Sequence, residues 1–123
     1  MSLQSCREEA AVVINDYVNK FGARKEIKET KEILTLLENN GVKLDPMFLV
    51  SDMCYNKTNK ANLKTCADDI LLFEFVSRGH YYILGGKYNY TGDVVWTDKH
   101  GFMKTVGEWK NGKLNYWGNN VIT

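Results

Sequence analysis

The sequence is poor in proline: Pro46 is the single one among 123 residues. No stretch is built from a few residue types, and no segment recurs at a fixed period. This composition excludes collagen-like chains, proline-rich linkers and repeat arrays. The 44% of hydrophobic and 25% of charged residues are ordinary for a globular protein. We therefore expect one domain over residues 1–123, with a modest core that needs no disulfide or metal.

Long hydrophobic runs and paired cysteines are also missing. No apolar run is long enough to cross a bilayer, and the first residues lack the charged and apolar regions of a signal peptide. The three cysteines are Cys6, Cys54 and Cys66. An odd count without a secretion signal favours reduced thiols. We therefore expect a cytoplasmic location and no membrane partner.

Neither sign of charge is in excess, because the formal net charge is +1. No global field then draws the chain onto nucleic acid or a membrane. Locally, however, Lys57, Lys60 and Lys64 fall within one segment that holds no acidic residue. This basic segment is the charge feature that favours an anionic partner.

The first third of the sequence has the apolar spacing of helices. Ser5 and Glu8 form a capping-box pattern that predicts a helix over about residues 7–20, closed by Gly22. A narrower apolar stripe predicts a second helix over about residues 24–38. The run Asn39-Asn40-Gly41 is a strong stop signal for that second helix.

The polar run from Ser51 to Lys60 separates the helical part from the rest. Ser51 is well placed as the N-cap of a short third helix that would carry Cys54, Tyr55 and Asn56. A polar loop would then follow, from Lys57 to Cys66. The helical part of the domain would thus cover about residues 5–57.

Alternating side chains after Ile70 predict strands joined by tight turns. Ser77-Arg78-Gly79 can turn the first hairpin, and Asn111-Gly112 is a strong signal for the last one. The sequence therefore predicts an α+β fold in which two to three N-terminal helices precede an antiparallel β meander over about residues 70–118. Helices followed by a hairpin are the element order of a winged helix-turn-helix.

Metal and nucleophile patterns are weak. Cys54, Cys66, His80 and His100 could supply four ligands, but none of them are spaced two to four residues apart as zinc ligands usually are. We therefore predict neither a metal site nor a cofactor. Cys54 near a helix start, with a histidine as base, leaves a small cysteine-dependent enzyme as one alternative.

The element order and the polar run together favour a non-enzymatic, winged-helix-like domain that binds duplex DNA. Asparagine amides suit adenine edges, and lysine and arginine suit phosphates. The candidate nucleic-acid-binding residues are Asp52, Tyr55, Asn56, Lys57, Asn59, Lys60, Lys64 and Arg78.

A second alternative is a protein-interaction or accessory domain with an aromatic docking surface. Tyrosine and tryptophan are common anchors in protein interfaces. The candidate interaction residues are Tyr81, Tyr88, Tyr90 and Trp96.

The run Ser51-Asp52-Met53-Cys54-Tyr55-Asn56 resembles a small uncharacterised domain of bacteria and phages with the pattern Ser-Asp-x-Cys-Tyr-Asn. The likeness continues through Phe73-Glu74, Arg78-Gly79, Leu84-Gly85 and the turn Tyr88–Gly92. Such domains are associated with restriction-type nuclease neighbourhoods, so the resemblance implies a role in DNA handling. It supplies no activity, and Val50 stands where that pattern has proline.

Overall fold

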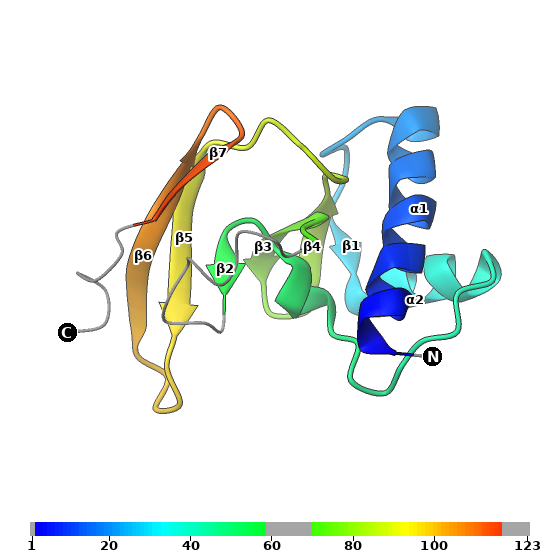
Figure 1. Cartoon of the computed structure of the whole chain (residues 1–123), viewed down its shortest axis with the longest axis horizontal. Helices are drawn as coiled ribbons and strands as arrows, with labels where there is room; N and C mark the ends of the chain where they lie inside the picture. Colours follow the sequence, from blue (N-terminus) through cyan, green and yellow to red (C-terminus); the bar gives the residue numbers. More distant parts are fainter. Residues whose placement is uncertain (1, 59–69, 117–123) are drawn as a thin grey trace.

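The computed structural model describes residues 2–58 and 70–116, which form an α+β fold. Helices α1 (Leu3–Phe21) and α2 (Thr30–Asn39) lie at one end of the molecule (Figure 1). A three-stranded sheet in the order β1-β4-β3 occupies the middle, and a four-stranded sheet in the order β2-β5-β6-β7 the other end (Figure 1). Neither helix of the described ranges has the length and apolarity that a bilayer crossing needs.

Helix α1 starts one turn earlier than predicted. Its N-cap is Ser2, whose hydroxyl accepts a hydrogen bond of 3.0 Å from the Ser5 amide. A serine at either position can cap the helix, and the earlier cap adds a turn. The helix ends at the predicted place, where Gly22 adopts a φ of 91° and its amide bonds to the Val18 carbonyl.

Residues 24–29 are not helical, so the predicted start of the second helix is wrong. Arg24 has a φ of 55°, and its amide donates to the Ile83 carbonyl. Strand β1 (Lys28–Glu29) pairs antiparallel with β4 (His80–Ile83). The backbone bonds offered by this sheet edge override the helix propensity of the residues.

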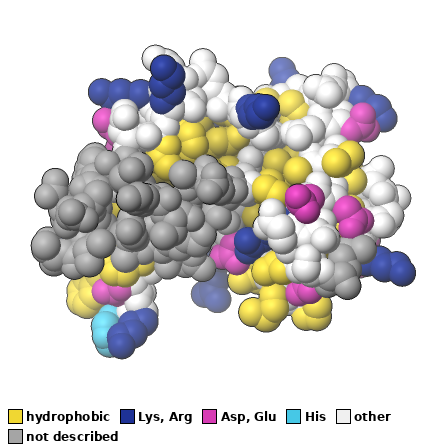
Figure 2. Space-filling view, in the orientation of Figure 1, with side chains coloured by type: hydrophobic (Ala, Val, Ile, Leu, Met, Phe, Trp, Pro, Cys, Tyr) yellow, Lys and Arg dark blue, Asp and Glu magenta, His cyan; other side chains and the backbone are white. Residues whose placement is uncertain are grey.

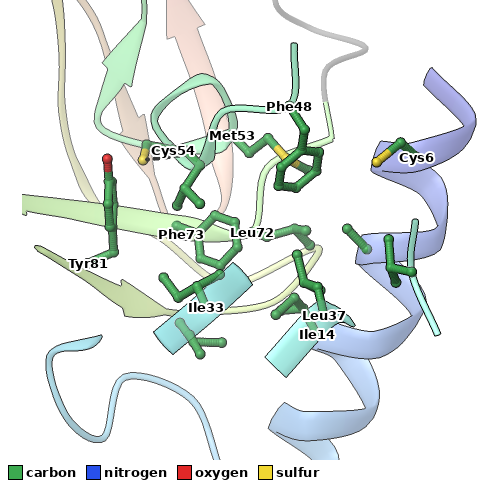
Figure 3. Packing of buried hydrophobic residues seen from close by; sticks show 14 residues of the cluster. Cys6, Ile14, Ile33, Leu37, Phe48, Met53, Cys54, Leu72, Phe73 and Tyr81 are labelled. Atoms are coloured by element: carbon green, nitrogen blue, oxygen red, sulfur yellow. Dashed lines mark hydrogen bonds between the residues drawn. The ribbon is translucent and has the colours of Figure 1, made fainter. Parts of the chain in front are cut away.

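The main core lies between the helices and the three-stranded sheet (Figure 3). Cys6, Ala10 and Ile14 recur every four residues on α1, and all three are fully buried. Ile33 and Leu37, four residues apart, form the buried face of α2. The other buried members of this cluster are Val42, Phe48, Val50, Met53, Cys54, Leu72, Phe73, Tyr81 and Ile83.

The strands do not form one continuous meander. Strand β3 (Phe73–Ser77) pairs antiparallel with β4 in the first sheet. In the second sheet β5 (Gly92–Thr97), β6 (Met103–Lys110) and β7 (Lys113–Tyr116) are antiparallel. The Asn111-Gly112 turn between β6 and β7 is confirmed, since both residues have positive φ values, 49° and 80°.

The predicted third helix is a single turn of 3-10 helix, η1 (Val50–Met53). It begins after Leu49 rather than after Ser51, and it ends before the residues that it was expected to carry. Cys54 already has extended backbone angles, with φ −102° and ψ 140°. The helix stops because this backbone bonds to a neighbouring strand: the Tyr55 amide donates to the Phe73 carbonyl at 2.9 Å.

Residues 54–58 join the two sheets. Cys54 forms a parallel bridge with Phe73 of β3, and β2 (Lys57–Thr58) pairs parallel with β5. Between them, the Asn56 amide group bonds twice to Phe75, accepting from its N–H and donating to its C=O, both at 2.8 Å. The backbone carbonyl of Asn56 accepts a hydrogen bond from the Val95 amide at 3.0 Å. One residue therefore closes the edge of the first sheet and starts the second.

Substitution of Asn56 tests this junction. We expect Asn56→Ala to lower the free energy of unfolding by about 2–3 kcal/mol, because it leaves two backbone groups of β3 unpaired. Asn56→Asp keeps the shape but loses the N–H donor, so it should also destabilise the protein at neutral pH. Urea unfolding followed by circular dichroism measures both, with the exposed Asn115→Ala as the matched control. Equal stability of the Asn56 and Asn115 variants would contradict the assigned role.

Candidate functional site: an aromatic cleft

Those residues predicted to bind nucleic acid that the structure describes do not project together from a helix. Asp52 lies 3.4 Å from Arg7 in an ion pair, and Lys57 lies over the Phe75 ring at 4.6 Å. Tyr55 is only 3% exposed, and the Asn56 amide is engaged by Phe75. The Asn56 amide is therefore not free to read a base edge as predicted, because the edge of β3 takes its hydrogen bonds.

Arg78 alone of the described members of this set is exposed, in the turn between β3 and β4. Asn59, Lys60 and Lys64 lie outside the described residues, as does Cys66. The assignment of these side chains to a nucleic-acid interface stays a prediction.

The predicted nucleophile Cys54 is buried in the main core. It is 2% exposed, and its thiol donates to the Val50 carbonyl at 3.6 Å. Burial raises the pKa of the Cys54 thiol, which disfavours the reactive thiolate. Within residues 2–58 and 70–116, no three histidine, cysteine, aspartate or glutamate side chains group as metal ligands do.

Thiol labelling tests this placement. In a Cys66→Ser background, Cys6 and Cys54 should resist a thiol-reactive disulfide reagent at neutral pH, because both are buried. Both should react once the chain is unfolded in urea. Rapid labelling of Cys54 in the folded protein would instead support the enzyme alternative.

The predicted interaction residues separate into different environments. Tyr81 is 5% exposed in the main core, with its ring edge-on to Phe73 and Phe75. Trp96 packs at the edge of a small cluster in the second sheet. Tyr88 and Tyr90 do lie together, with ring centroids 6.4 Å apart.

Tyr55 is the centre of an aromatic cluster between the two sheets. Its ring stacks on Tyr90 at 5.4 Å and meets Trp109 edge-on at 5.3 Å. Its hydroxyl donates to the Gly85 carbonyl at 2.8 Å and accepts from the Tyr88 amide at 3.0 Å. The Trp109 indole N–H donates to the Tyr55 carbonyl at 2.9 Å. Each polar atom of Tyr55 and Trp109 that enters the cluster is therefore satisfied.

The Glu74 carboxylate contacts this cluster through Tyr90. The Tyr90 hydroxyl donates to Glu74 Oε2 at 3.0 Å, and Arg24 Nε donates to Glu74 Oε1 at 2.9 Å. The Arg24 guanidinium also lies 4.6 Å from the centre of the Tyr82 ring. Burial, and then the negative charge of Glu74, raise the pKa of Tyr90 well above its ordinary value.

Alkaline titration tests the contact between the Tyr90 hydroxyl and Glu74. Tyr90 has its pKa raised in the folded chain, so its contribution to stability is complete below the unfolded-state pKa of about 10. That contribution is lost as the pH rises from the unfolded-state pKa through the higher folded-state pKa. In Glu74→Gln the Tyr90 pKa should fall toward the ordinary value, because the neighbouring negative charge is gone. NMR of ring-labelled tyrosine measures the shift, and an unchanged Tyr90 titration would contradict the assigned contact.

Beside the cluster a cleft of about 390 Å³ opens to the surface. It lies where α1, the 70–72 segment, the 86–88 turn and the β6–β7 hairpin meet. On the face shown in Figure 2, hydrophobic side chains gather between the two ends of the molecule, with basic side chains above them. The lining residues are Ala11, Tyr55, Ile70, Leu71, Leu72, Gly86, Lys87, Tyr88, Trp109 and Gly112.

Tyr88 was predicted as an interaction residue and lines the cleft, whereas Tyr55 was predicted at a nucleic-acid interface and lies buried in the aromatic cluster. The cleft residues Leu71, Lys87 and Trp109 were not predicted as site residues. Trp109 carried a usable signal, because it lies two residues before the predicted Asn111-Gly112 turn. A large aromatic side chain at that place in a hairpin packs on the neighbouring part of the protein. Nothing in the sequence brings α1 to the same place, because that contact is set by the tertiary fold.

Comparison with known proteins gives a family and one curated relative. The model of the family described as "Domain of unknown function (DUF7225)" matches residues 6–116. The chain is similar to "Uncharacterized protein YnaC" of Bacillus subtilis (strain 168), with 33% identity over 107 residues. The match covers 85% of this chain and 36% of that protein, so the chain spans about a third of its relative. No solved structure matches the chain.

Proposed function

We propose that this chain, which belongs to the family described as "Domain of unknown function (DUF7225)", is a non-enzymatic binding module. Its aromatic cleft takes an apolar segment of a partner protein. The observation that carries the proposal is the cleft of about 390 Å³ walled by Tyr55, Leu71, Tyr88 and Trp109. Concave, apolar and aromatic-lined surfaces are where binding energy concentrates in protein interfaces.

The chemistry of the walls favours an apolar occupant. The Tyr55 hydroxyl and the Trp109 indole N–H are already bonded within the protein. A polar metabolite in the cleft would therefore lose bonds to water and find few replacements. An aromatic or large aliphatic side chain makes no such demand.

The walls are also held in place before anything binds. The Tyr55 hydroxyl ties the Gly85 and Tyr88 backbones, and the Gly112 amide donates to the Tyr90 carbonyl at 2.9 Å. A rigid site loses little conformational entropy on binding, which strengthens affinity. Among the described lining residues there is no serine, cysteine, histidine or carboxylate, which supports binding rather than catalysis.

Duplex DNA remains the second candidate, as part of the winged-helix-like prediction and its restriction-nuclease association. The observation that favours it is the exposed Arg78 in the β3–β4 turn, where a cation can reach a phosphate. It would be preferred over the cleft if low-salt anisotropy titration with duplex DNA gave micromolar binding that Arg78→Ala weakened.

The cleft proposal is tested with peptides selected from a random library displayed on phage. Selected peptides should contain aromatic or large aliphatic residues, and Ala11→Phe should weaken their binding at least tenfold by filling the cleft. Calorimetry measures this loss. Tyr88→Ala should also reduce affinity, because it removes one wall.

Phe102→Ala is the matched control, because Phe102 is a 73% exposed aromatic residue outside the cleft. Its affinity for the same peptides should equal that of the unmodified chain. Peptides that bind Ala11→Phe and the unmodified chain equally well would refute the cleft as the binding surface.

A further inference from the structure

Lys87 is the single charged residue among those that line the described part of the cleft. Its side chain is exposed and forms no ion pair with any described residue. The cleft therefore places one positive charge beside an apolar surface.

The backbone of Lys87 is unusual. Its φ is 57°, in the left-handed region that glycine, asparagine and aspartate occupy far more readily than lysine. A lysine there costs stability of order 1 kcal/mol relative to glycine. Such outliers persist where the surrounding structure enforces them, and they concentrate at functional sites.

Two long-range hydrogen bonds enforce this conformation from either side. The Gly86 amide donates to Asn15 Oδ1 of α1 at 2.7 Å, and the Tyr88 amide donates to the Tyr55 hydroxyl at 3.0 Å. A Cβ added at Gly85 would lie 3.2 Å from both Asn15 and Val18, so the turn is pressed against α1. The base of the lysine is therefore fixed while its ammonium group remains in solvent.

We infer that the partner segment carries a carboxylate next to its large apolar side chain, and that Lys87 pairs with this carboxylate at the rim. This inference rests on the proposed binding function and names the chemistry of the segment. The apolar side chain enters between Leu71, Tyr88 and Trp109. Charge complementarity then sets orientation and selects acidic partners over basic ones.

A dye measures this preference directly. Anilinonaphthalene sulfonate is an apolar anion, and anilinonaphthalene is its neutral counterpart. Lys87→Glu should weaken the sulfonate about tenfold and leave the neutral dye unchanged, as expected for an exposed charge pair converted into a repulsion. Lys99→Glu makes the same change in net charge outside the cleft, and it should leave both dyes unchanged.

Lys87→Gly separates binding from folding. Glycine adopts positive φ readily, so this variant should unfold at the same or a higher temperature. It should nevertheless bind the sulfonate about threefold more weakly, because the exposed cation is gone. A merely structural lysine would not combine unimpaired stability with weaker anion binding.

Peptides distinguish a protein segment from a free anion. The blocked peptide Glu-Phe-Glu should shift amide NMR signals of residues 85–88 and 109–112 at concentrations where Lys-Phe-Lys does not. Equal shifts by the two peptides, or equal sulfonate affinity in Lys87→Glu and Lys99→Glu, would overturn the charge preference alone. Dye binding unaffected by Ala11→Phe would overturn the cleft proposal itself.

Discussion

The hydrogen bonds between the Asn56 amide group and the Phe75 backbone are the contact on which the arrangement of the two sheets depends. Neither sheet is large, and β2 consists only of Lys57 and Thr58. Because Asn56 also accepts from Val95 in the second sheet, one residue sets the distance between β3 and β5. A side-chain amide can do this since it offers a donor and an acceptor in one plane, as a peptide group does.

This junction also explains the cleft. Cys54 turns into the main core and Tyr55 into the aromatic cluster, because successive side chains of an extended segment point to opposite sides. The Tyr55 ring then fills the space between the sheets, and Tyr90 and Trp109 pack on it from the second half of the chain. Tyr55, one of the five residues 54–58 that join the sheets, is thus also the centre of the aromatic surface.

The sequence predicted local features better than it predicted partners across the fold. The end of α1 at Gly22 and the hairpin turn at Asn111-Gly112 depend on the backbone preferences of single residues, and the predictions of both are confirmed. Residues 24–29 were assigned to a helix because nothing local reveals the strand edge with which they pair. Likewise, Asn56 in a polar run has the pattern of an exposed residue, and only the position of Phe75 shows that its amide is engaged.

The cleft is bounded by parts of the chain that are distant in sequence. Ala11 belongs to the helical end, whereas Trp109 and Gly112 belong to the second sheet. An occupant would contact both ends and add contacts across a junction that few hydrogen bonds hold. A ligand that binds only this folded arrangement raises the free energy of unfolding in proportion to the logarithm of its concentration. Under the proposed function, binding and the relative placement of the two sheets are therefore linked, because an occupant that contacts both ends would stabilise the arrangement that the Asn56 hydrogen bonds also hold.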